Sequence, residues 1–282
     1  MNKYAKIKCM LVAVDTGATK TLVASFGKDG VLDQQIKFAT PKDHNEYAKQ
    51  LRSTIIQQFE GKTVEAIVIA IPGIIKKGKV VMCGNLPWHN FDITADLAGV
   101  LGNTPIFVEN DANLAGLAET RFLKTIPNQS LYVTISTGIG TGIITEGHIN
   151  PDLRNSEAGH ALIEYDGIVR EWEDFASGKA ILKVYGKYAR DITNKRTWNQ
   201  IADRISRGFL TVIPILQPDI IIIGGSIGSY FDRYSTQLLS LLKEKLPPMV
   251  PCPKIVQAKY PELAVIYGCY YYALDNIVNK KA

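Results

Sequence analysis

Two short glycine-containing segments carry the residue types that bind phosphate groups. The first is DTGATKT, residues 15–21, at the end of an apolar run. Glycine lets backbone N–H groups come close to a phosphate, and the Thr16, Thr19 and Lys20 side chains offer further donors. Asp15 can hold Mg²⁺ through bound water, because Mg²⁺ prefers oxygen ligands and keeps much of its hydration shell. Taken alone, the segment also fits an ordinary hairpin with a capping aspartate.

The second segment is STGIGTG, residues 136–142, with glycines at alternate positions. A dinucleotide-binding G-x-G-x-x-G motif must open a helix. Here residues 143–145 and the following Glu146-Gly147 favour a returning strand and a turn. The segment therefore predicts a second phosphate-binding hairpin rather than a dinucleotide site, with its turn over residues 137–142.

A third segment, Glu109-Asn110-Asp111, stands between an apolar run and an Ala- and Leu-rich stretch. One interpretation makes Asp111 the N-cap of a helix over 112–122. The other makes Asp111 a general base that accepts the proton of a sugar hydroxyl through a short hydrogen bond. Asn110 beside it can donate to one sugar oxygen and accept from another hydroxyl.

Polar residues scattered along the chain complete a set suited to a sugar, whose many hydroxyls need carboxylate, amide and imidazole partners. They are Asn85, Glu157, His160 and Glu173. Each of them also fits a surface or capping role, and Glu157 with His160 lacks an evident third ligand for a metal. Gly224-Gly225, after the apolar run DIIII, would let a flat ring lie against backbone, although a plain strand-to-helix turn explains the pair equally well.

The elements that must position these residues follow a repeated order. Strands are predicted over 8–15 and 21–26, with a third after the turn at 28–30, and a similar order restarts at 131–136. This predicts a duplicated α/β domain with a ligand cleft between the copies. The other predicted strands are 66–71, 106–108, 220–223 and 254–256, and the predicted helices are 47–59, 93–101, 112–122, 171–188, 197–216, 230–245 and 263–278.

Composition narrows the class of protein. The 282 residues suggest one large or two medium domains, and the 46% hydrophobic content is ordinary for a globular chain. The formal charge of +5 is scattered, so nucleic acid is not an expected partner. The four cysteines have no disulfide or metal spacing, and the apolar stretch at 10–14 is too short for a signal-peptide core or membrane span. These features predict a cytoplasmic protein with free thiols and no membrane partner.

Together the motifs resemble the ROK family (repressors, open reading frames and kinases) of the actin/hexokinase/Hsp70 superfamily, from residue 12 to about 268. DTGATKT resembles its first phosphate loop, STGIGTGIITEGHI its second, and PDIIIIGGSIG its adenosine loop. IPGIIKKGKVV followed by NLPW is similar to its sugar loop, and VENDANLAGLAE matches its catalytic segment most specifically. The resemblance implies an α/β protein with a duplicated actin-like ATPase (ribonuclease H-like) fold of two lobes and an interlobe cleft.

The resemblance also implies a glucokinase-like enzyme that uses ATP and Mg²⁺ to phosphorylate a hexose at the 6-hydroxyl, with Asp111 as catalytic base and Asp15 holding Mg²⁺ through water. The implied sugar-binding residues are Gly73, Asn85, Asn110, Asp111, Glu157, His160 and Glu173. The implied nucleotide-binding residues are Asp15, Gly17, Thr19, Lys20, Thr137, Gly138, Gly224 and Gly225. The lobes would span 1–112 and 113–282, with helix 263–278 a candidate to pack back on the first lobe, and a homodimer is compatible with the family.

The sequence departs from the family pattern in two places. Asn155-Ser156 replaces the usual Ala-Gly, and residues 161–172 contain none of the cysteines of the zinc loop that many members carry. No zinc site is therefore expected, and the usual support of His160 is missing. The family's regulators carry an N-terminal helix-turn-helix, whereas this chain reaches its first predicted strand almost at once, so a DNA-binding repressor is not expected.

Three functions stay open at this point. The first is a hexose kinase, and the second is a kinase for N-acetylmannosamine or N-acetylglucosamine, which would share every motif. The third is a non-catalytic sugar-sensing protein on the same fold. Asp15, Asp111 and both glycine-rich segments argue against the third, because sugar binding alone needs no phosphate loops.

Overall fold

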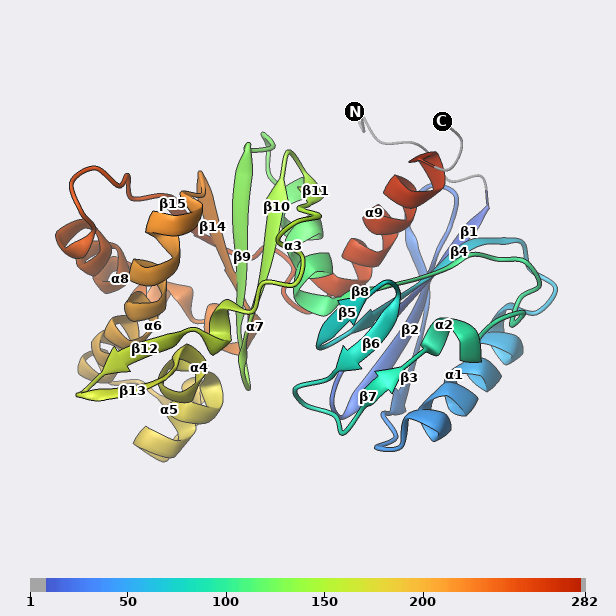
Figure 1. Cartoon of the computed structure of the whole chain (residues 1–282), viewed down its shortest axis with the longest axis horizontal. Helices are drawn as coiled ribbons and strands as arrows, with labels where there is room; N and C mark the ends of the chain where they lie inside the picture. The colour runs from blue at the N-terminus through green and yellow to red at the C-terminus, as the bar shows by residue number, and fades with distance from the viewer. Residues whose placement is uncertain (1–8, 280–282) are drawn as a thin grey trace. The chain divides into compact units, whose positions relative to one another are not determined.

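The structure, a computed structural model, describes residues 9–279 and divides the chain into two compact units. One consists of Met1–Ala118 with Leu263–Ala282, and the other is Glu119–Glu262. The first unit is thus assembled from two separate stretches of sequence, whereas the second is continuous. Figure 1 follows the chain through both units. The first predicted strand, over 8–15, is observed from Met10, and position 8 lies outside the described residues.

The first unit is built on a five-stranded mixed sheet in the order β3-β2-β1-β4-β8. β1 pairs antiparallel with β2 and parallel with β4, and β4 pairs parallel with β8. Because parallel neighbours end at the same edge, β1 and β8 bring the residues that follow them to one side of the sheet. The strands are β1 (Met10–Thr16), β2 (Lys20–Phe26), β3 (Leu32–Ala39), β4 (Val64–Ile71) and β8 (Ile106–Asn110).

Helices α1 (His44–Phe59) and α9 (Ala264–Asn279) cover this sheet (Figure 1). The Asp43 carboxylate caps α1 by accepting the N–H groups of Asn45 and Glu46. α1 buries one stripe against the β1 and β4 residues that face it, and α9 packs on β1 and β4 as well. The α1 stripe consists of Tyr47, Leu51, Ile55 and Phe59.

A small antiparallel sheet in the order β5-β6-β7 was not predicted from the sequence. It consists of β5 (Ile74–Lys76), β6 (Lys79–Met82) and β7 (His89–Phe91), and α2 (Ile93–Asp96) follows it. The helix expected over 93–101 therefore ends five residues early, at Asp96. Trp88 and Phe91 anchor the small sheet, because their buried rings pack beside Tyr47 of α1.

The second unit repeats the topology of the first. Its sheet has the order β11-β10-β9-β14-β15, again an antiparallel meander followed by two parallel strands. This repeat confirms the duplicated α/β fold expected from the sequence. The strands are β9 (Gln129–Ile135), β10 (Ile139–Thr145), β11 (His148–Ile149), β14 (Ile220–Gly224) and β15 (Lys254–Gln257). β10 begins at Ile139, so Gly140 and Gly142 lie in a strand rather than in the expected turn.

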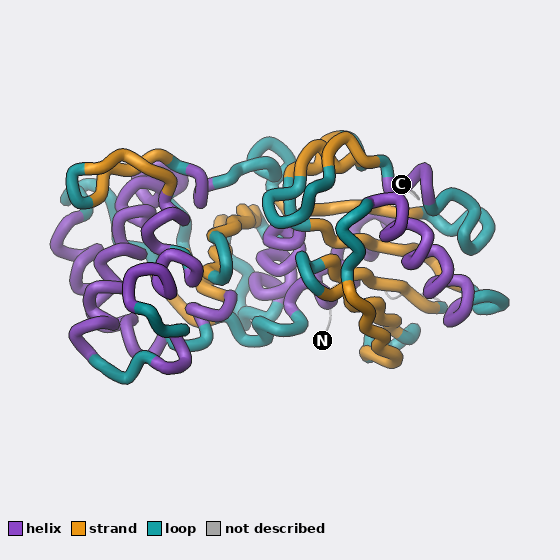
Figure 2. Tube along the Cα trace, turned by 90° about the horizontal axis from the view of Figure 1, so that it is seen from below, coloured by secondary structure: helices purple, strands orange, loops and turns teal. Residues whose placement is uncertain are grey.

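Helices dominate the rest of the second unit, as Figure 2 shows in purple. The helix predicted over 171–188 is two helices, because the Ser177 side chain caps a new one by accepting the Ala180 N–H. A hairpin of β12 (Leu162–Tyr165) and β13 (Ile168–Glu171) precedes them and was not predicted. The helices are α4 (Trp172–Ala176), α5 (Gly178–Tyr185), α6 (Lys195–Leu216), α7 (Gly225–Gly228) and α8 (Phe231–Lys245), with short 3₁₀ turns at Ala158–His160 and Ala189–Asp191.

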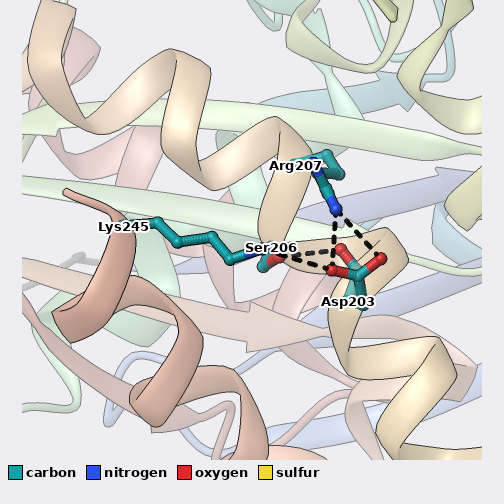
Figure 3. A network of polar contacts seen from close by, with 4 residues as sticks. All are labelled: Asp203, Ser206, Arg207 and Lys245. Atoms are coloured by element: carbon teal, nitrogen blue, oxygen red, sulfur yellow. Dashed lines mark hydrogen bonds and ion pairs between the residues drawn. The ribbon is translucent and has the colours of Figure 1, made fainter. Parts of the chain in front are cut away.

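A polar network joins α6 to the end of α8 (Figure 3). The Arg207 guanidinium donates to the Asp203 carboxylate at 3.0 Å, and the Lys245 ammonium lies 4.0 Å from the same oxygen. Ser206 donates to the Asp203 carbonyl at 2.7 Å. These contacts supplement an apolar core between the two helices. No helix within residues 9–279 has the length and apolar character needed to cross a bilayer.

Candidate active site

Asp15 and Asp111 are brought together at one edge of the first sheet. Asp15 lies near the end of β1 and pairs with Ala70 of β4, and Ala70 pairs with Glu109 of β8, two residues before Asp111. Burial, reinforced by the negative charge of Asp111, raises the pKa of Asp15 to about 7. Burial also raises the pKa of Asp111, against the opposing effect of backbone N–H donors. Two neighbouring carboxyl groups whose charged forms are disfavoured suit a ligand that supplies positive charge or protons.

Asn110, rather than Asp111, caps helix α3 (Asp111–Arg121). The Asn110 Oδ1 accepts the N–H groups of Ala112 at 2.8 Å and Asn113 at 3.1 Å. Asp111 Oδ1 accepts the adjacent Ala112 N–H at 2.9 Å, and the backbone N–H of Asp111 itself also stabilises the carboxylate. The capping interpretation of Asp111 was therefore wrong, because a cap must precede the first helical residue to reach the donors of the first turn. The Asp111 carboxylate is therefore not used to cap α3.

Glu109 supports this junction and was missed by the sequence reasoning. Its side chain is 1% exposed, and Oε1 accepts the Asn110 N–H at 2.9 Å and the Asn113 Nδ2 at 3.0 Å. No local pattern signalled this contact, because Glu109 lies in strand β8 and Asn113 lies in the helix that follows it. Glu109 thus fixes the backbone from which Asp111 projects.

Gly73 is held against the same junction. Its carbonyl accepts the Asn110 Nδ2 at 2.9 Å, and its φ of +146° strongly favours glycine. A Cβ at Gly73 would lie 2.1 Å from the Met82 carbonyl oxygen, so no larger residue fits. Asn85 is exposed in the connection between β6 and β7. Nearby Cys83 is buried, and burial with the charge of Asp111 raises the pKa of its thiol to about 12.

The first glycine-containing turn has its carbonyl groups tied back by residues that follow β3. The Thr40 hydroxyl donates to the Gly17 carbonyl at 2.7 Å, the Lys42 ammonium to the Ala18 carbonyl at 3.0 Å, and the Thr40 N–H to the Thr19 carbonyl at 3.0 Å.

The Gly17 N–H donates across the turn to the Lys20 carbonyl at 3.0 Å. Within residues 9–279, the N–H groups of Ala18 and Thr19 have no protein acceptor. These two N–H groups are donors that an anion could use, and the Thr19 and Lys20 side chains are exposed beside them. Thr40 and Lys42 are supporting residues that sequence reasoning did not identify.

The second turn spans only Ser136, Thr137 and Gly138, and the chain downstream fixes it. The Ser136 N–H donates to the Gly138 carbonyl at 2.9 Å, and the Gly178 N–H at the start of α5 donates to the Ser136 carbonyl at 2.6 Å. The Ile139 N–H donates to Glu173 Oε2 at 3.0 Å. A Cβ at Gly138 would lie 2.6 Å from that carboxylate oxygen, so Gly138 and Glu173 are close neighbours.

His160 joins the same cluster in the second unit. The segment before it docks on β10, where Thr141 donates to the Ser156 carbonyl at 3.1 Å and a Cβ at Gly159 would lie 2.0 Å from the Ile139 carbonyl oxygen. His160 Nδ1 lies 2.8 Å from Glu171 Oε2.

The hydrogen bond with Glu171 is the largest influence and raises the pKa of His160. Burial opposes this effect, and the charges of Glu173, Glu171 and Glu157 add to it. One ligand atom each of His160, Glu171 and Glu173 lies within 4.8 Å of the others. Glu171 and Glu173, rather than Glu157, are thus the carboxylates that accompany His160 at this spacing. The imidazole and the Glu171 carboxylate already satisfy each other, so the arrangement is explained by hydrogen bonding alone.

Gly224 and Gly225 lie at the end of β14, next to the strand that leads into the second turn. Gly225 has φ +77°, and a Cβ there would lie 2.5 Å from the Ile135 carbonyl oxygen. A Cβ at Gly224 would lie 2.2 Å from the Tyr132 hydroxyl oxygen. Gly225 is therefore required by close packing on the β9 backbone, whereas a larger residue at Gly224 would need the end of the Tyr132 side chain to move.

Comparison with known proteins shows which family this chain resembles. The sequence pattern of the ROK family matches residues 11–276. The glucokinase of Thermotoga maritima is 27% identical over 93% of this chain and 96% of its own length. The N-acetylmannosamine kinase of Haemophilus influenzae is 26% identical over 97% of this chain and 98% of its own. A ROK family glucokinase from Streptomyces griseus, solved with glucose and AMPPNP, shares the fold, with a TM-score of 0.77 at 21% identity over 92% of this chain and 97% of that one.

Proposed function

This chain belongs to the ROK family and is an ATP-dependent sugar kinase, and we propose that it phosphorylates a hexose hydroxyl with Asp111 as general base. The closeness of the Asp15 and Asp111 carboxyl groups at one edge of the first sheet is the observation that carries this proposal. The acceptor is the 6-hydroxyl of a glucose-like hexose. An N-acetylated amino sugar is the alternative, supported by the N-acetylmannosamine kinase among the relatives.

The chemistry asked of the protein is small. As the sugar oxygen attacks the γ-phosphorus, its proton passes to the Asp111 carboxylate, a new P–O bond forms, and the bond to ADP breaks. The raised pKa of Asp111 makes it a stronger base than an exposed aspartate. Asn110 and Glu109 hold the backbone at Asp111, so the carboxylate is oriented before substrate arrives.

Mg²⁺ fits the residues present at the first turn. Asp15 is a partly buried carboxyl group whose charged form lacks compensation from the protein, as its raised pKa indicates, and carboxylate oxygen is the donor that Mg²⁺ prefers. Asp15 would hold the ion through water. When bound, Mg²⁺ supplies neutralisation of phosphate charge.

The two turns bind phosphate groups of ATP in this proposal. In the first turn, Thr40 and Lys42 donate hydrogen bonds to carbonyl oxygens that would otherwise repel an anion. Gly17, Thr19 and Lys20 are the residues of this turn that would contact the phosphate. In the second, Thr137 and Gly138 form the turn itself. Gly224 and Gly225 lie against the adenosine.

The residues proposed to contact sugar hydroxyls are those that the family resemblance implies, namely Gly73, Asn85, Asn110, Glu157, His160 and Glu173. Because the Asn110 Oδ1 is occupied by the start of α3 and one Nδ2 hydrogen by Gly73, Asn110 has one remaining hydrogen for the sugar. The expected contribution of Asn110 is therefore a single donor.

We place the enzyme in the cytoplasm, because all four cysteines are unpaired, as in a reducing compartment. A homodimer stays a prediction.

ADP release measured with a coupled assay tests the function. Purified protein with MgATP is offered glucose, mannose, fructose, N-acetylmannosamine and N-acetylglucosamine. With at least one sugar, the rate of phosphorylation should saturate as the sugar concentration rises. Asp111→Asn should lower kcat by about 10²- to 10⁴-fold, the usual contribution of general base catalysis. Circular dichroism checks that the variant is folded. Near-normal turnover by Asp111→Asn would remove Asp111 from the mechanism. Absence of ADP release from the wild-type protein with every sugar would favour the sugar-sensing alternative.

A further inference from the structure

The β12–β13 hairpin brings Glu171 to His160 across eleven residues of sequence. Leu162 and Glu171 are paired in the hairpin, and the Trp172 N–H donates to the Ala161 carbonyl at 3.0 Å, which extends the pairing toward His160. His160 Nδ1 and Glu171 Oε2 therefore meet at 2.8 Å from two backbone segments that are themselves hydrogen-bonded. The contact is built into the hairpin rather than made by two independent surface side chains.

The two carboxylates nearest to His160 have different partners. Glu173 Oε2 accepts the Ile139 N–H at 3.0 Å, so this carboxylate is tied to the second glycine-containing turn. Glu171 is tied to the imidazole. Trp172, between them in sequence, is buried so closely against α6 that a Cβ at Gly208 would lie 2.0 Å from its ring. The buried Trp172 therefore fixes the backbone positions of Glu171 and Glu173 on either side of it.

We propose that Glu171 is a positioning residue that holds His160 by Nδ1 and so leaves Nε2 as the only imidazole atom for a sugar oxygen. The proposal rests on the proposed function, because it assigns His160 to the sugar. Imidazole has two nitrogens, and a carboxylate at Nδ1 requires that nitrogen to carry hydrogen. In the charged imidazolium Nε2 then donates, and in the neutral form it accepts.

The charges around His160 favour the donating form. The acidic groups facing it are Glu157 from the preceding segment, Glu171 from β13 and Glu173 from α4. All three raise the pKa of His160, so the imidazolium persists to a higher pH than in a free histidine. Donation from Nε2 is lost as the pH rises through that raised pKa. The His160 and Glu171 side chains are 49% and 40% exposed, so the pair should matter to ligand binding more than to folding.

Glu171→Gln tests the proposal, because glutamine keeps the size of the side chain and removes its charge. Asp174→Asn is the matched control, an exposed acid in the same helix region with no contact to His160. The pKa of His160 is measured by NMR titration of its ring, assigned with His160→Gln. Glu171→Gln should lower this pKa toward the ordinary value of about 6.5, and the control should leave it unchanged.

Steady-state kinetics provide the second readout. Glu171→Gln should raise the KM for the sugar about tenfold, the usual effect of losing a hydrogen bond to a charged group, with kcat and the KM for ATP within twofold of wild type. The fall of kcat/KM with rising pH should move to lower pH in the same variant. An unchanged His160 pKa or an unchanged sugar KM would overturn the proposal.

Two further outcomes are distinguishable. If the wild-type protein phosphorylates no sugar, the proposed function fails, and the NMR titration still decides whether Glu171 sets the charge of His160. If EDTA without nucleotide shifts the His160 ring signals of the wild-type protein, a divalent ion occupies Nδ1, and the assignment of Glu171 as its partner is wrong.

Discussion

The carboxyl group of Asp15, near the end of β1, lies close enough to Asp111, at the start of α3, for the charge of Asp111 to raise the pKa of Asp15. Burial is the larger cause, and together they raise the pKa from 3.8 to about 7. Between these values the native state holds a proton that the unfolded chain has lost, so stability falls as the pH rises from about 4 to 7. Asp15 thus lowers the free energy of unfolding at neutral pH, as expected of a residue whose role is to bind a ligand.

Asp15→Asn should therefore stabilise the protein at pH 8 and have little effect at pH 4. A shift of about three pKa units corresponds to about 4 kcal/mol at most. Urea unfolding at pH 4, 6 and 8 without Mg²⁺ measures the difference. Asp33→Asn, at an exposed position of β3, serves as the control. A gain that did not vary with pH would mean that Asp15 does not hold its proton at neutral pH.

Lys42→Met should weaken ATP binding and leave the sugar site intact. The substitution removes both the donor to the Ala18 carbonyl and a positive charge beside the first turn. We expect the KM for ATP to rise about three- to tenfold, as for the loss of one exposed hydrogen bond with charge, with little change in the KM for the sugar. Lys37→Met removes an exposed lysine of β3 without a contact to the turn. Equal effects of the two substitutions would point to general electrostatics instead.

Gly73→Ala should be much more damaging than Gly84→Ala, although the two glycines are only eleven residues apart. A methyl group at Gly73 would lie 2.1 Å from the Met82 carbonyl oxygen on a backbone with positive φ, whereas nothing lies within 4 Å of one at Gly84. We expect Gly73→Ala to cost about 2–4 kcal/mol in urea unfolding or to displace the loop and raise the sugar KM. Wild-type behaviour of Gly73→Ala would show that this segment relaxes freely.

Gly208→Ala should damage the sugar site from a distance. Its methyl group would overlap the Trp172 ring and displace Trp172, which lies between Glu171 and Glu173 in sequence. We expect a loss of about 1–3 kcal/mol in thermal unfolding together with a higher sugar KM. Trp172→Phe in the same chain should recover part of the loss, because the smaller ring leaves room for the methyl group. Additive losses in the double variant would argue against this contact.

The central strands of both sheets could be predicted from the sequence because they are buried on both faces. β1, β4 and β14 read as apolar runs that end at a polar residue, at Pro72-Gly73 and at a glycine pair, and each was placed within two residues. The hairpins β5–β6 and β12–β13 were missed. Their strands are three or four residues long and carry exposed lysine or exposed apolar side chains, so they show no usable periodicity.

Most residues of the candidate site belong to sequence motifs, but the residues that hold them in place do not. Thr40 and Lys42 reach the first turn from 23 and 24 residues away in sequence, and Glu171 reaches His160 from 11. Such contacts depend on strand pairing and on a hairpin that local patterns did not reveal. The exchange of capping roles between Asn110 and Asp111 was equally hidden, because both residue types favour the start of a helix.

The discontinuity of the first unit has a consequence for biosynthesis. The sheet face that α9 covers cannot be closed until α9 has left the ribosome, whereas all of Glu119–Glu262 has already been synthesised by then. The nascent chain should therefore complete its later half first and hold an open apolar sheet in the meantime. A stop codon shortly before residue 263 would leave that face bare and direct the product to aggregation or proteolysis.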